Sequence, residues 1–128
     1  MDELAATATT LGGSHPYAVY FQCTRALAQY RVGQYAAALE WAEKTLRANP
    51  EADLSAEAYA VCALAHERLG QAGAAKSDLA KAFNARDHLP KPTAGLIGSE
   101  WRDWIIAHAL CAEAEGAIDK ALANRPIP

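Results

Sequence analysis

Two cysteine–histidine pairs have a spacing that could hold a metal ion. Cys62 and His66 are four residues apart and His108 and Cys111 are three apart, so each pair would share one face of a helix. Four such side chains can bind zinc tetrahedrally if the two helices meet. We expect instead that a helix over 72–85 separates them and that both pairs are core positions. No metal site and no cofactor are therefore predicted.

Other candidate chemistry in the chain is incomplete. A cysteine nucleophile needs a setting that stabilises the thiolate and a base oriented by a third group, whereas Cys62 is predicted in the middle of a helix among apolar residues. The segment Gly-Leu-Ile-Gly at 95–98 lacks the Lys-Ser/Thr of a phosphate-binding loop and follows no strand. Trp101 and Trp104 are three residues apart, which is typical of helix anchors. No catalytic residue is predicted, and we expect a protein that is not an enzyme.

The composition favours a single soluble domain built from closely packed helices. The 128 residues are 52% hydrophobic and 21% charged, and much of the hydrophobic fraction is alanine, which favours helix and lets helices approach closely. A net charge of −3 with mixed signs argues against nucleic-acid and anionic-membrane partners. No apolar run reaches the roughly 20 residues of a membrane span. Three cysteines make no disulfide framework, so we expect a reduced, cytoplasmic protein.

The expected helices are organised around the stretch 31–50, RVGQYAAALEWAEKTLRANP. Gly33 ends a helix that begins near Pro16, and a second helix over 35–48 follows and ends before Pro50. A related stretch, RLGQAGAAKSDLAKAF, begins at Arg68 and aligns without gaps, which places Gly70 37 residues after Gly33. The repeat predicts two more helices, over 56–69 and 72–85, and a period of this size indicates a helical array.

The remaining segments are expected to flank or close this array. Ser55 is the predicted N-cap of the helix over 56–69, and Ser99 that of a last helix over 99–123, which would cover the open end. Residues 1–15 are predicted to be an N-terminal stub or linker, and 87–98 a connection. On the helix over 35–48, acidic residues stand four positions before basic ones, as Glu40 before Lys44 does, and ion pairs are expected there.

These residues resemble the tetratricopeptide repeat (TPR), with its pattern W-x2-L-G-x2-Y…A-x3-F…P. In the second unit the first four pattern positions are occupied by Tyr59, Cys62, Ala63 and His66, and the next two by Ala75 and Leu79. In the first unit the pattern is matched by Ala26, Ala38 and Pro50. Three residues of the first unit depart from it: Gln22, Arg25 and Gln29. The resemblance implies an all-α, right-handed superhelix at 16–128, with helix–turn–helix repeats at about 17–50 and 55–86 and a C-terminal capping helix.

The segments LAQYRVGQY, LAHERLGQAGAAKSDLAKA and EWRDWIIAHALCAEAEGAI are also similar to the C-terminal repeat region of large bacterial serine/threonine kinase and WD40-type proteins, planctomycete-like ones above all. The chain has no VAIK-like lysine, HRD or DFG, so the resemblance does not imply a kinase. It implies a non-catalytic interaction module, part of or related to a larger signalling protein.

Such a module is expected to hold a peptide or helix in a concave groove. The partner would be another protein or another domain of the parent chain. Cys23, Leu27 and Val61 replace polar residues with which related repeats grip a chaperone's C-terminal carboxylate, so that specificity is not expected. A homodimer is the main alternative, and a zinc- or thiol-dependent enzyme the remote one. The predicted groove residues are Tyr20, Cys23, Leu27, Tyr30, Arg31, Glu57, Ala60, Leu64, Glu67 and Arg68.

Overall fold

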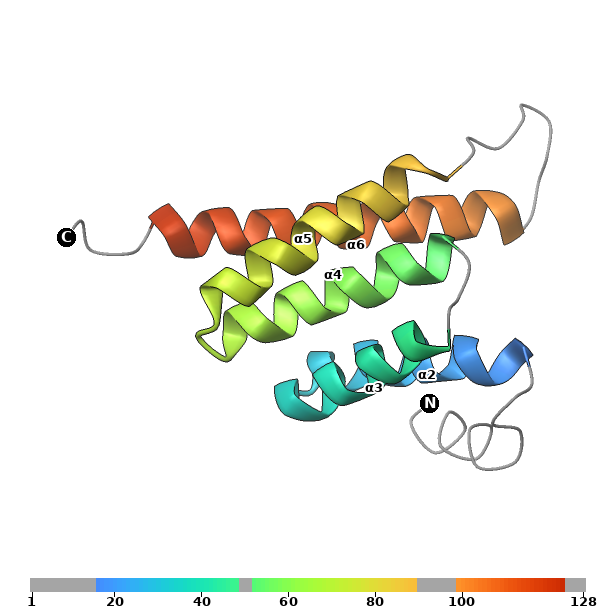
Figure 1. The fold of residues 1–128 in the computed structure, drawn as a ribbon, viewed down its shortest axis with the longest axis horizontal. Coiled ribbons are helices and arrows are strands. Elements are labelled where there is room, and N and C mark those ends of the chain that lie inside the picture. Colours follow the sequence, from blue (N-terminus) through green and yellow to red (C-terminus); the bar gives the residue numbers. More distant parts are fainter. Residues whose placement is uncertain (1–15, 49–51, 90–98, 124–128) are drawn as a thin grey trace.

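The computed structural model of the chain describes residues 16–48, 52–89 and 99–123. These residues form the helices α2 (Pro16–Arg31), α3 (Tyr35–Arg47), α4 (Ala52–Arg68), α5 (Ala72–Asp87) and α6 (Ser99–Ala123), as shown in Figure 1. No strand occurs in this part of the chain, so the predicted all-α class is confirmed. The predicted stub at 1–15 and most of the predicted connection lie outside the described residues. None of the helices described is both long and apolar enough to cross a membrane.

The two glycines of the repeat end α2 and α4 in the same way. Gly33 has φ 85° and Gly70 has φ 80°, the left-handed conformation that side chains disfavour. The N–H of Gly33 donates to the carbonyl of Tyr30 at 3.1 Å, and the N–H of Gln34 donates to that of Gln29 at 2.8 Å. The same two bonds recur at Gly70, and together they define a Schellman C-cap. Each cap turns the chain back into an antiparallel partner helix.

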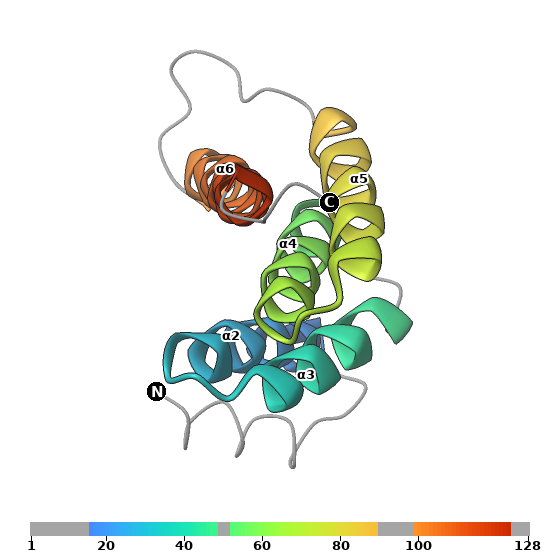
Figure 2. The ribbon, with the colours of Figure 1, turned by 90° about the vertical axis from the view of Figure 1, so that its left-hand side faces the viewer.

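The helices form two antiparallel pairs and a last helix laid along them. α2 packs on α3, α4 packs on α5, and α3 and α4 join the pairs. In the view along the helices (Figure 2), α2, α4 and α6 lie on one side of the molecule and α3 and α5 on the other. Figure 1 shows that α2, α4 and α6 run in the same direction. Three parallel helices therefore share one face of the described molecule.

Helix α4 is the centre of the core. Its residues from Ala60 to Ala65 are all buried, and it packs against every other described helix. Alanine makes this possible because a methyl group lets neighbouring helices approach on several sides at once. Ala26 and Ala63, which match one another in the repeat, are both fully buried where the helices meet. Ala107, Cys111 and Ala114 bring α6 into the same core.

Two expectations about these helices are wrong. α4 begins at Ala52, so Ser55 lies inside the helix and is not its N-cap. No residue of the sequence Ala-Asp-Leu at 52–54 breaks a helix, and an acidic residue is favourable in a first turn. Helix α5 does not separate α4 from α6, because α6 packs against both. The small residues of α4 and α6 allow this contact.

The ion pairs expected on α3 are also absent from the described residues. Lys44 lies with its Nζ 4.5 Å from the centroid of the Trp41 ring, and no ion pair joins it to Glu40. Arg47 likewise makes no ion pair with Glu43 in the described structure. A cation over the face of an indole gains an attraction comparable to an exposed ion pair, and one side chain cannot hold both positions.

The glycine turns can be tested by substitution with alanine. Gly33→Ala and Gly70→Ala should each lower the free energy of unfolding by about 1 kcal/mol, because a Cβ meets no neighbour at either site and the cost is that of left-handed backbone. Gly116→Ala is the matched control. It lies inside α6 with open space around it, and should raise stability by about 0.5–1 kcal/mol. Urea denaturation gives all three values; equal effects at Gly33 and Gly116 would contradict the assignment.

Candidate functional site

A pocket of about 120 Å³ opens on the face shared by α2, α4 and α6. All three helices contribute to its wall, which is mainly aliphatic and aromatic and carries one carboxylate, that of Glu57. Tyr20 is 45% exposed at its rim and Ile105 on the adjoining turn of α6 is 55% exposed. The volume is that of one large apolar side chain. The lining residues are Tyr20, Cys23, Thr24, Leu27, Leu54, Glu57, Val61, Ile106 and Leu110.

Four of the predicted groove residues line this pocket: Tyr20, Cys23 and Leu27 from α2, and Glu57 from α4. Ile106 and Leu110 were not predicted there. They stand four residues apart on one face of α6, and this spacing indicates that the face packs against another helix. No local pattern indicates that it also closes a pocket with α2. The third wall depends on where α6 lies.

Three further predicted groove residues are part of the core. Ala60 and Leu64 are fully buried, so they cannot contact a ligand held on the surface. The physical reason is that α6 lies against α4 and covers that side of it. Tyr30 is 8% exposed, and its ring centroid is 5.6 Å from that of Tyr35. Truncating Tyr30 would disturb the fold as well as any binding surface.

The remaining predicted residues lie at the other end of this face, in the last turns of α2 and α4. Arg31 donates to Glu113 of α6 through both Nη atoms, at 2.5 and 2.7 Å. This hydrogen bonding raises the pKa of Arg31 and lowers the pKa of Glu113. Arg68 lies close enough to the Tyr30 hydroxyl for that group to raise the pKa of its guanidinium. Glu67, just before Arg68, is half-buried.

A Cys–His–Asp constellation lies between α4 and α5, but its electrostatics oppose nucleophilic catalysis. His66 Nδ1 is 2.5 Å from Asp78 Oδ2, which orients the ring, and Cys62 is one helical turn away. The thiol of Cys62 is 2% exposed. Burial raises its pKa far above the ordinary value, and the negative charges of Asp78 and Glu43 raise it further. A nucleophile needs the reverse, a stabilised and accessible thiolate.

The two cysteine–histidine pairs do not converge although α4 and α6 meet. His66 faces Asp78, while His108 donates from Nδ1 to the Trp104 carbonyl at 2.9 Å and stacks on the Trp104 ring. The Cys111 thiol donates to the Ala82 carbonyl at 3.8 Å, and burial raises its pKa to about 11. No group of three His, Cys, Asp or Glu side chains in the described residues could hold a metal ion. The side chain of Trp101 lies outside the described structure.

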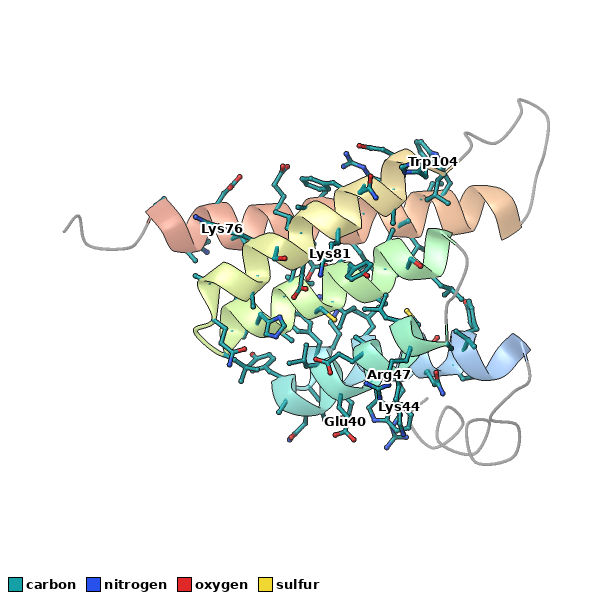
Figure 3. The ribbon with its side chains drawn as sticks, in the orientation of Figure 1. Glu40, Lys44, Arg47, Lys76, Lys81 and Trp104 are labelled. Atoms are coloured by element: carbon teal, nitrogen blue, oxygen red, sulfur yellow. The ribbon has the colours of Figure 1, made fainter. Side chains whose placement is uncertain are left out.

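The opposite face of the molecule, over α3 and α5, is polar. Figure 3 shows Glu40, Lys44 and Arg47 pointing away from α3, and Lys76 and Lys81 on α5. Arg25 of α2, one of the residues that depart from the repeat pattern, is half-buried with its Cζ 4.7 Å from the Trp41 ring centroid. Trp41 therefore contacts both Arg25 and Lys44. Both cations therefore make a cation–π contact with an aromatic ring of the same chain.

The buried thiols give a direct test of the enzyme alternative. Cys62 and Cys111 should react with a maleimide many times more slowly in the folded protein than in urea at pH 7, because folding buries both thiols and raises both pKa values. Peptide mass spectrometry assigns the labelled cysteine. Labelling of Cys62 in the folded protein at pH 6, faster than that of a free thiol, would contradict this result.

The described site therefore combines an apolar pocket with an exposed arginine–carboxylate pair. Such a surface can bind an apolar side chain and exchange hydrogen bonds with a polar one. The thiols of Cys62 and Cys111 are buried side chains that pack in the core. Comparisons with known protein families, with curated proteins and with solved structures found no match to this chain.

Proposed function

We propose that this chain is a TPR-like, non-catalytic interaction module that holds a peptide or helix of a partner on the face formed by α2, α4 and α6. The partner is another protein or another domain of a larger signalling protein to which the chain belongs. The observation that carries the proposal is the pocket on this face, which is lined by Tyr20, Cys23 and Leu27 from α2 and is open to solvent. An apolar pocket of this size accepts one anchoring side chain.

The repeat architecture supports this assignment. The 37-residue period, the two matching Schellman turns and the alternation of helices between two faces are what a right-handed TPR-like superhelix requires. In this interpretation α6 takes the place of the first helix of a third unit, beside α4 and α5, and caps the array. First helices of successive units line the binding face of such an array, and α2 and α4 have that position here.

The chemistry of the described residues also favours binding over catalysis. The thiol nearest to a histidine–aspartate pair is Cys62, which is buried and held in its protonated form. The pocket wall presents one carboxylate, Glu57, among mainly apolar groups.

Thr24→Arg should block the pocket and abolish peptide binding. Thr24 lines the pocket, and among the described residues its hydroxyl donates only to the Tyr20 carbonyl of its own helix, at 3.1 Å, so replacing it costs little stability. The long arginine side chain would fill the space that the partner's side chain needs. The probe is a phage-displayed library of 12-residue peptides, with affinities of the selected peptides then measured by fluorescence anisotropy.

The matched control is Ser77→Arg, which adds the same charge to the exposed surface of α5. We expect at least a tenfold loss of affinity for Thr24→Arg, because one anchor side chain contributes about 1.5–3 kcal/mol, and no change for Ser77→Arg. Equal melting temperatures of the two variants exclude unfolding as the cause. Peptides that bind Thr24→Arg as well as the parent chain would contradict the assignment of the pocket.

Self-association is the second candidate, favoured by the exposed apolar side chains of Val32, Leu69 and Ile105. We expect the chain to remain a monomer of 13.6 kDa, because these three residues belong to separate elements. In the proposed function, the face formed by α2, α4 and α6 binds a different protein or domain. Light scattering after size exclusion, over about a hundredfold range of concentration, decides this. A mass that rises toward that of a dimer would favour the scaffolding alternative.

A further inference from the structure

An ion pair spans the binding face between its first and last helices. Arg31 in the last turn of α2 donates two hydrogen bonds to the Glu113 carboxylate of α6, at 2.5 and 2.7 Å. In the described residues α2 and α6 do not otherwise pack against one another. The arginine side chain is 50% exposed and the glutamate side chain 36% exposed. An exposed ion pair of this kind contributes little to folding, so its carboxylate can be exchanged for another.

A second guanidinium lies at the same end of the face. Arg68 is the repeat equivalent of Arg31, 37 residues later, and is also exposed. Tyr30 is near both: its hydroxyl raises the pKa of the Arg68 guanidinium, and its ring centroid is 5.6 Å from Cζ of Arg31. Two guanidinium groups therefore lie near the buried tyrosine, at the same end of the face as the carboxylates of Glu67 and Glu113. Of these groups, Arg31 is the one whose carboxylate partner lies across the face on α6.

We propose that the partner is an acidic amphipathic helix, and that one of its carboxylates displaces Glu113 from Arg31 while an apolar side chain enters the pocket. This rests on the proposed function and specifies the partner's chemistry. In the free protein Glu113 then occupies the position that the partner's carboxylate takes in the complex, and it competes with the partner for Arg31. The exchange is balanced: two charge-assisted hydrogen bonds break and two form.

The geometry sets the spacing of the two groups on the partner. Thr24 at the pocket and Arg31 are seven residues apart on α2, about 10 Å along the helix axis. A helical partner lying along α2 would therefore place its apolar anchor and its acidic residue about two turns apart, at i and i+7. The partner's negative charge belongs at the end of the face where Arg31 lies, because its carboxylate would pair with that guanidinium.

The experiment begins with peptides selected from the 12-residue library, which should show a large apolar residue and an Asp or Glu seven positions away. Anisotropy with these peptides then compares three variants. Glu113→Gln should tighten binding about two- to fivefold, because it removes the competitor of a weak exposed pair. Arg31→Gln should weaken binding roughly tenfold and cancel the gain of Glu113→Gln in the double variant. Glu115→Gln, exposed on the same helix, should change nothing.

The possible failures are distinguishable. If the selected peptides depend on Thr24 but carry no acidic residue, the acidic partner is ruled out and the binding module stands. If Glu113→Gln weakens binding as much as Arg31→Gln does, the ion pair shapes the face instead of competing with the partner, and the proposal is overturned. If the library yields no binder that Thr24→Arg blocks, the proposed function itself fails. Melting curves of each variant report whether the fold is kept.

Discussion

The structure depends on how little space the side chains of α4 occupy. Between Ala56 and Ala65 every second residue on average is an alanine, and Val61 and Leu64 are the largest fully buried side chains of this helix. Neighbouring helices can therefore approach it from several directions at short distances. The positions of α3, α5 and α6 follow from this, and with them the face on which α2, α4 and α6 lie side by side. A bulky residue in this stretch would separate helices on more than one side.

The sequence predicts those features that are decided locally. A glycine followed by an alanine-rich amphipathic segment specifies the turns at Gly33 and Gly70, because only short-range hydrogen bonds and backbone conformation are involved. The helix periodicity and the small residues at Ala26 and Ala63 depend on the same short-range rules. These features identify the two helix pairs and the class of the fold.

Long-range packing decides the features that the sequence did not predict. Whether α6 packs on α5 alone or also on α4 depends on the fit of Ala107, Cys111 and Ala114 into the core, and no local pattern expresses that fit. The pocket is completed by α6, so its third wall could not be foreseen either. The pair of Arg31 and Glu113 joins residues 82 positions apart. Tyr30 has the spacing of an exposed groove residue but is buried against Tyr35.

Equivalent positions of the two repeats carry different chemistry. Trp41 of the first unit corresponds to Asp78 of the second, and each organises its surroundings. The indole attracts cations to its faces, whereas the carboxylate binds His66 and adds to the effect of burial, which is the main cause of the raised pKa of the Cys62 thiol. The backbone framework is shared, so the units differ in what their side chains stabilise and not in how the helices pair.

The burial of α4 against all four neighbours also governs how the molecule can come apart. In a long array each unit touches only the adjacent units, so an end can fray while the rest stays folded. Here α2, α3, α5 and α6 each share an interface with α4. Detaching any one of them exposes apolar surface on the central helix and weakens the packing of the other helices against it. We therefore expect the two repeats to unfold as one cooperative unit, with the slowest amide hydrogen exchange in α4.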